Sequence, residues 1–82
     1  MNGTDPVIVY TTPSCFYCKI AREFLRRNNI SVIERDVEAN PSFLAELQAK
    51  SHQRGVPVFE IGDEIFVGFD RPAIAKALGI RE

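Results

Sequence analysis

The sequence predicts a small α/β domain with the element order β-α-β-α-β-β-α. Three observations support this prediction: apolar β-branched runs alternate with segments of helical periodicity, a short turn joins the last two runs, and Asn, Pro and Gly mark the boundaries. At 82 residues the chain is too short for two independent cores. We therefore expect residues 1–82 to form a single domain.

The first predicted strand is Val7–Tyr10, an apolar run without polar interruption, as in a central strand that is buried on both faces. Pro13 cannot continue a strand and Ser14 is a good helix N-cap, so a helix should begin here. Up to about Asn28 the apolar side chains recur at helical spacing, which predicts an amphipathic helix; they are Phe16, Ile20, Phe24 and Leu25. Asn28 and Asn29 can end this helix.

The segment Ile30–Val37 returns to β-type residues and predicts the second strand. Because one helix separates it from the first strand, the two strands should pair in parallel through a right-handed crossover. Asn40-Pro41-Ser42 then interrupts the pattern, and apolar residues at helical spacing predict a second helix that runs through Ala49.

The C-terminal part of the chain predicts a β-hairpin followed by a helix. Val58–Ile61 and Glu64–Val67 flank the turn-forming pair Gly62-Asp63. The last helix covers Pro72–Gly79, because proline is favoured in the first turn of a helix and glycine just after its end.

The charge balance and the hydropathy exclude several classes of protein. The formal net charge is −1, so there is no basic field that would gather nucleic acid. No apolar stretch approaches the roughly 20 residues that cross a bilayer, and Met1–Pro6 lacks the features of a signal peptide. We expect a cytoplasmic protein that binds neither nucleic acid nor membrane.

The two cysteines, Cys15 and Cys18, lie at the expected start of the first helix, one turn apart and within bridging reach. A structural disulfide is unfavourable in a reducing cytosol, and so short a loop would add little stability. Backbone N–H groups and the helix dipole favour a thiolate at Cys15, which is therefore the predicted nucleophile. Cys18 lies one turn deeper and is the predicted resolving thiol.

Exchange between a thiolate and a disulfide needs no metal and no cofactor, so we expect none to be bound. The metal alternative is a zinc site, which needs four ligands. The chain offers two cysteines and His52, which lies in a different element. The prediction for His52 is a surface or capping role.

Three segments together resemble the glutaredoxin family: Val9–Cys18, Arg54–Val58 and Val67–Asp70. The likeness covers nearly the whole chain and is closest to the small glutaredoxin-like redoxins of the YruB and NrdH types. It implies a thioredoxin fold, in which a four-stranded mixed sheet is flanked by three helices.

The resemblance also implies a set of substrate-binding residues. The bond between Val56 and Pro57 should be cis, with the backbone of Val56 pairing with the bound thiol peptide. Arg54 and Asp70 match positions that bind the carboxylate and amino ends of glutathione, and Tyr17 matches a tyrosine beside its thiol. Each also has a structural alternative: a solvated loop cation, a helix N-cap and an exposed aromatic ring, respectively.

The chain departs from the family pattern at several positions. Many members carry Lys where this chain has Thr12 and Pro where it has Phe16. Many also carry a Gly-Gly pair where Gly68 is followed by Phe69, which is either a recognition residue that crowds the tripeptide or, as we favour, part of the core. These departures leave open whether glutathione or thioredoxin reductase supplies the electrons, with a preference for the reductase.

The leading functional prediction is a monomeric dithiol oxidoreductase that reduces protein disulfides or glutathione-mixed disulfides. Its partners would be disulfide-containing client proteins and glutathione, thioredoxin reductase or both. The first alternative is a dedicated electron donor to one enzyme, such as ribonucleotide reductase. The second is a binding module whose thiols hold a metal or an iron–sulfur cluster.

Overall fold

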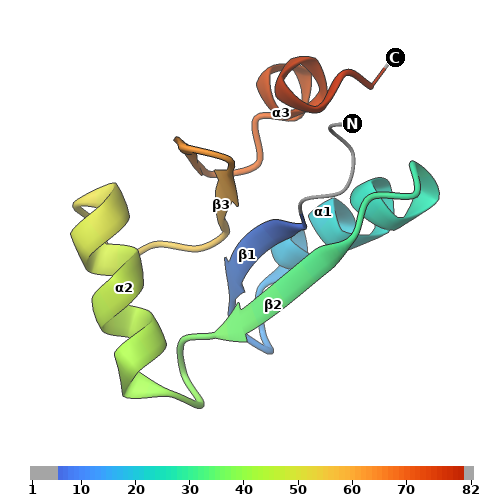
Figure 1. The fold of residues 1–82 in the computed structure, drawn as a ribbon. Helices are drawn as coiled ribbons and strands as arrows, with labels where there is room; N and C mark the ends of the chain where they lie inside the picture. Colours follow the sequence, from blue (N-terminus) through green and yellow to red (C-terminus); the bar gives the residue numbers. More distant parts are fainter. Residues whose placement is uncertain (1–5, 81–82) are drawn as a thin grey trace.

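The computed structural model describes residues 6–80, which form a four-stranded mixed sheet with three helices (Figure 1). The elements follow the predicted order, so the predicted fold class is confirmed; they are β1 (Val7–Thr11), α1 (Phe16–Arg27), β2 (Val32–Asp36), α2 (Pro41–Ser51), β3 (Val58–Ile61), β4 (Glu64–Val67) and α3 (Arg71–Leu78). Among the described residues, no helix is both long and apolar enough to cross a bilayer.

The strand order in the sheet is β2-β1-β3-β4, which makes β1 a central strand as predicted. β1 pairs in parallel with β2, with Val7 opposite Val32, and this confirms the predicted parallel pairing. It pairs antiparallel with β3, and β3 with β4, so the C-terminal hairpin extends the sheet on its other side. The carboxyl end of β1 leads directly into the segment that carries both cysteines.

Two apolar clusters fill the two faces of the sheet. One lies under α1 and α3 and contains Ala21, Leu25 and Ile74, together with Val7, Val9 and Phe59 from the strands. The other lies under α2 and contains Leu47 with Tyr10, Val37 and Val58. In Figure 1, α2 accordingly stands apart from α1 and α3. Each helix buries apolar area against the sheet, and this burial is the dominant favourable term in folding.

Helix α1 buries a different face from the one that its larger apolar residues suggest. Its buried side chains are Cys18, Ala21 and Leu25, whereas Phe16 and Ile20 are 68% and 37% exposed. At about 100° per residue, Phe16 and Ile20 fall on the side of the helix opposite this buried stripe. Ala21 is fully buried in this stripe, and the two larger apolar residues on the opposite side remain at the surface.

The helix ends confirm most of the predicted caps and correct one. Helix α1 begins at Phe16, so its N-cap is Cys15, and the prediction of Ser14 as the cap is wrong by one residue. Asn28 ends α1, His52 is the left-handed C-cap of α2, and Gly79 is the left-handed C-cap of α3. The capping role of His52 is therefore confirmed.

A polar network attaches α2 to the sheet around the buried ring of Tyr10. The Tyr10 hydroxyl donates to Glu46 Oε1 at 3.1 Å and accepts from Arg35 Nη1 at 3.4 Å and from Lys50 Nζ at 3.3 Å. Arg35 also donates to Glu46 at 2.5 Å, and Lys50 to Glu60 at 2.6 Å. The buried phenol is thus hydrogen-bonded, as a buried polar group must be to avoid a desolvation cost.

Candidate active site

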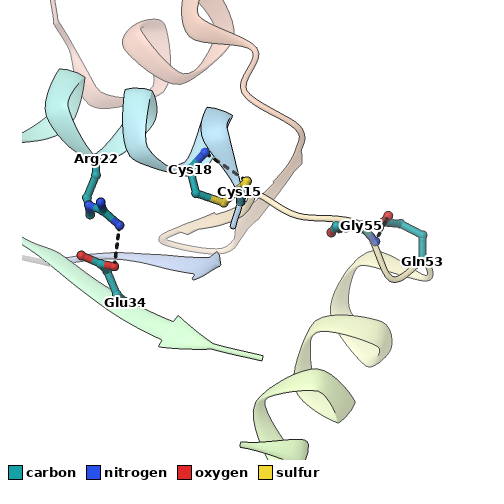
Figure 2. Close-up of a disulfide and its surroundings, with 6 residues drawn as sticks. All are labelled: Cys15, Cys18, Arg22, Glu34, Gln53 and Gly55. Carbon is teal, nitrogen blue, oxygen red and sulfur yellow. Dashed lines mark hydrogen bonds and ion pairs between the residues drawn. A yellow bond between two sulfur atoms is a disulfide. The ribbon is translucent and has the colours of Figure 1, made fainter. Parts of the chain in front are cut away.

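Cys15 and Cys18 form a disulfide at the start of α1, with their Cα atoms 5.2 Å apart (Figure 2). Cys15 is the last residue before the helix, and Cys18 lies in its first turn. Local structure accounts for this placement: the chain turns after β1, and the Cys15 N–H donates to the Thr12 carbonyl at 3.2 Å. The predicted pair of sulfurs is therefore assembled by one turn and one helix start.

The two cysteines differ in their exposure and in their contacts. Cys18 is 1% exposed and lies on the buried face of α1, whereas Cys15 is partly exposed. Cys15 Sγ accepts a hydrogen bond from the Cys18 backbone N–H at 3.1 Å (Figure 2). This donor is one of the N–H groups that a helix leaves unpaired at its start, where the dipole also favours negative charge. The site thus offers one accessible sulfur in a setting that favours an anion, and one sheltered sulfur.

A polar hollow of about 510 Å³ lies beside Cys15, between the start of α1 and strand β2. Arg22 Nη1 donates to Glu34 Oε1 at 3.0 Å across it, and the pair ties α1 to β2 (Figure 2). Asp36 closes one end and accepts from the backbone N–H groups of Glu38 and Ala39. Arg22, Glu34 and Asp36 were not predicted as site residues. Arg22 and Glu34 are 12 positions apart, and the only signal that could have brought them together is the predicted parallel pairing of the first two strands.

The loop before β3 holds the predicted cis peptide bond between Val56 and Pro57, and this prediction is confirmed. Gln53 braces the loop: its side-chain oxygen accepts from Gly55 N at 2.5 Å, and its amide donates to Gly55 O at 3.1 Å (Figure 2). A Cβ at Gly55 would lie 2.8 Å from that oxygen, so glycine allows this close approach. The Gly68 N–H donates to the Pro57 carbonyl at 2.8 Å and joins this loop to the end of β4.

The segment after β4 places Phe69 against the core and Asp70 at a helix start. The Phe69 ring lies 5.8 Å from that of Phe24 and 6.0 Å from that of Phe59, centroid to centroid. Asp70 is the N-cap of α3, and its carboxylate accepts from Ala73 N at 3.4 Å. Phe69 is thus part of the core packing, and Asp70 is a helix N-cap, as their structural alternatives predicted. The Asp70 carboxylate is also exposed to solvent.

The other predicted binding residues lie at the surface. Tyr17 is 62% exposed and makes an edge-on contact with the Phe16 ring. Arg54 is exposed in the loop before the cis bond, and Val56 is half-buried. Across residues 6–80, no three His, Cys, Asp or Glu side chains are grouped so that they could hold a metal ion.

Comparison with known proteins decides the family. The Glutaredoxin family model matches residues 7–67. The chain belongs to the glutaredoxin family. It is 36% identical to a glutaredoxin-like 8.6 kDa protein of a rubredoxin operon in Clostridium pasteurianum, over 70 residues that cover 85% of this chain and 93% of that protein. The predicted family is thereby confirmed.

Solved glutaredoxin-like structures share the fold. The thioredoxin-like protein BC3987 superposes with a TM-score of 0.83 at 30% identity, covering 88% of this chain and 99% of the other. The NrdH-redoxin of Escherichia coli gives a TM-score of 0.80 at 23% identity, covering 95% of this chain and all of the other. Family membership and the bridged Cys15–Cys18 pair identify the chain as a thiol–disulfide oxidoreductase.

Proposed function

We propose that this oxidoreductase reduces protein disulfides or glutathione-mixed disulfides, with Cys15 as the nucleophile and Cys18 as the resolving thiol. The observation that carries the proposal is the asymmetry of the pair. Cys15 is partly exposed and its sulfur accepts a hydrogen bond from a backbone N–H at the helix start, whereas Cys18 is buried on the inner face of α1. An attacking thiolate needs exposure and stabilisation of its charge, and a resolving thiol needs only to reach the first sulfur.

The reaction requires two successive exchanges. The Cys15 thiolate attacks one sulfur of the substrate disulfide, a new S–S bond forms, and the other substrate sulfur leaves as a thiolate that takes up a proton. Cys18 then loses its proton and attacks Cys15 Sγ. The second substrate thiol leaves, and the two protein sulfurs are bridged as in this structure. Two electrons have passed to the substrate, and a reductant must return them.

Serine variants test the division of labour between the two sulfurs. Cys15→Ser should abolish disulfide reduction, because the nucleophile is lost. Cys18→Ser should instead accumulate a mixed disulfide with the substrate, which mass spectrometry detects as added mass. If Cys15→Ser traps substrate and Cys18→Ser does not, the two roles are reversed. Iodoacetamide should alkylate Cys15 first in the reduced protein.

For the binding surface, we propose the loop residues Val56 and Pro57, with Gly68, Phe69 and Asp70 beside them and with Tyr17 and Arg54 at the rim. Support for Tyr17, Arg54, Val56 and Pro57 comes from the family match over residues 7–67. The hydrogen bond of 2.8 Å from Gly68 to Pro57 places the segment after β4 beside this loop. The backbone of Val56 would pair with the extended substrate, and the Arg54 and Asp70 charges would meet opposite charges of a glutathionyl group.

We favour a flavoprotein reductase such as thioredoxin reductase over glutathione as the electron donor. Thr12 stands where many relatives carry a lysine, and a missing charge-assisted hydrogen bond costs about 1.5–3 kcal/mol, or roughly ten- to a hundredfold in affinity. The Phe69 ring fills space that a second glycine would leave open.

A dithiol carrier also needs a reducing compartment, which supports a cytoplasmic location.

The donor is tested by comparing NADPH oxidation with thioredoxin reductase and with glutathione plus glutathione reductase. Thioredoxin reductase should support the faster turnover, and Thr12→Lys should raise only the glutathione-dependent rate. Turnover with glutathione alone would contradict this preference. Phe69→Gly is a poorer probe, because it also removes a ring that packs against the core.

A further inference from the structure

We propose that a groove between α1 and the start of α3 binds an acidic, apolar segment of the protein whose disulfide is reduced. We call it the α1–α3 groove; it has a volume of about 380 Å³. The inference rests on the proposed function, because the segment belongs to the substrate that reacts at Cys15. It adds a docking surface that shares Phe69 with the proposed binding surface but excludes the loop at Val56 and Pro57.

The apolar side of the α1–α3 groove begins next to the nucleophile. Phe16 directly follows Cys15 in the chain, and Phe16, Ile20 and Phe24 recur every four residues along one side of α1. The ring of Phe69 packs edge-on against Phe24 and forms the inner wall. Two of these lining residues, Phe16 and Ile20, are among the five exposed large hydrophobic residues of the described chain. An exposed apolar patch of this kind marks an interaction site.

The rim of the α1–α3 groove is positively charged, although the molecule as a whole is not. Lys19, Arg27 and Arg71 line it against one acid, Glu23. Helix α1 holds four of the ten cationic residues of the chain but only one of the eleven acidic ones, so six cations and ten acids remain elsewhere. The groove is thus a local basic stripe on a mildly acidic protein. Charge complementarity favours an acidic partner and steers its approach.

The dimensions of the α1–α3 groove set the length of the bound segment. Phe16 and Phe24 are eight residues apart on α1, or about 12 Å at 1.5 Å per residue. An extended chain covers this distance with about four residues. A cysteine whose sulfur reaches Cys15 would therefore place a side chain three or four positions away at the Phe69 end of the groove. There the Arg71 guanidinium lies 5.6 Å from the centre of the Phe24 ring. Carboxylates beside that side chain would lie opposite Lys19 and Arg27.

Two synthetic peptide disulfides test this inference: the oxidised dimer of Cys-Gly-Glu-Leu-Glu, and the same peptide with lysine in place of glutamate. The reduced protein should reduce the acidic peptide about three- to tenfold faster than the basic one at low ionic strength, because the basic stripe attracts only the former. This preference should disappear in about 0.5 M salt, where charges are screened. Equal rates for the two peptides at low salt would overturn the proposal.

Arg27→Glu and Arg26→Glu form a matched pair of variants. Both residues lie exposed in the last turn of α1 and both substitutions change the charge equally, but only Arg27 lines the groove. Arg27→Glu should remove most of the preference for the acidic peptide, and Arg26→Glu should change it less than twofold. Equal losses in the two variants would show a general charge effect and overturn the docking site. Ile20→Ser and Ile33→Ser form a second matched pair, which tests the apolar contact: both isoleucines are exposed, but only Ile20 lines the groove. Only Ile20→Ser should slow the reduction of the acidic peptide.

Two further measurements separate this inference from the proposed function. A small uncharged disulfide should be reduced equally fast by wild type and by Arg27→Glu; if the wild type fails to reduce it, the proposed function fails. Titrating the oxidised protein with a cysteine-free Gly-Glu-Leu-Glu peptide should shift the NMR signals of α1 and of Phe69 without any reaction. NMR shifts confined to other elements would overturn the docking site. A dimer of this protein that Ile20→Ser dissociates would also overturn it, because the groove would then be covered by a second copy of the chain.

Discussion

At the residue scale, Cys15 combines two roles in one sulfur. It caps α1 by accepting the Cys18 N–H, and it is one half of the redox pair. Cys15 is partly exposed just before the first turn of α1, where a substrate can reach its sulfur. Serine at this position preserves an acceptor for the N–H, so Cys15→Ser removes the chemistry while it keeps the cap.

Asp70 also has a structural role, which one pair of variants separates from a binding role. Asp70→Ala removes the acceptor for Ala73 N and should lower the free energy of unfolding by about 0.5–2 kcal/mol, the usual value of an N-cap. Asp70→Asn keeps the acceptor and should be close to wild type in urea denaturation. If Asp70 binds the glutathione amino group, both variants should show a raised KM for a glutathionylated substrate, and the Asn variant should show it without a loss of stability. An Asn variant as unstable as the Ala variant would contradict the capping role.

At the scale of single elements, α2 depends on polar contacts as well as on apolar burial. Its Glu46 and Lys50 side chains meet the Tyr10 hydroxyl, and they pair with Arg35 on β2 and Glu60 on β3. One helix is thereby joined to three strands. The guanidinium of Arg35 also lies 5.5 Å from the centre of the Phe43 ring, within the range of a cation–π contact.

The alkaline stability of the protein should depend on Lys50. The hydrogen bond to Glu60 raises the pKa of Lys50 above its ordinary value of 10.5. When the pKa of a lysine is higher in the folded state than in the unfolded state, its charged form stabilises the protein. This stabilisation is fully present below the pKa of the unfolded state and is lost as the pH rises through the pKa of the folded state. The difference in unfolding free energy between wild type and Lys50→Met should therefore be constant from about pH 6 to 9 and shrink above about pH 10.5. A difference unchanged up to pH 12 would show that the ammonium charge is not what stabilises.

The sequence predicted elements better than the contacts between them. The element order, the hairpin, the end of α1 at Asn28 and the glycine cap at Gly79 all follow from local signals, and the structure confirms them. The buried face of α1 could not be predicted in the same way, because it depends on which side of the helix packs against the sheet and not on the larger apolar residues alone. The network at Tyr10 joins residues up to 40 positions apart, and no local pattern encodes it.

At the scale of the whole molecule, the active site draws on both halves of the fold. The β1–α1 connection supplies the sulfurs, and the β3–β4–α3 half supplies the cis-proline loop and the residues that follow Gly68. The position of the two sulfurs could be predicted from the residues alone. The prediction of the cis-proline loop rested on the family resemblance, since nothing in composition or spacing distinguishes Pro57 from the other four prolines.

Phe69 joins these two halves, and its removal should be costly. The ring contacts Phe24 on α1 and Phe59 on β3, so Phe69→Ala should lower the free energy of unfolding by about 2–3 kcal/mol, somewhat less than for a fully buried phenylalanine. Tyr17→Ala is the matched control, because this aromatic residue is 62% exposed; its effect should stay within about 0.5 kcal/mol. Urea denaturation measures both. Equal midpoints for the two variants would contradict a packing role for Phe69.

The central position of β1 determines where the protein opens by local fluctuation. Its backbone is hydrogen-bonded to β2 on one side and to β3 on the other, and β3 likewise lies between β1 and β4; within residues 6–80, β2 and β4 are each paired on one side only. Amide hydrogens of β1 and β3 should therefore exchange with solvent last, near the rate of global unfolding. The edges of the sheet can open and close many times while the strand that leads to Cys15 stays in place, so the reactive sulfur keeps its position through fluctuations that rearrange the rim around it.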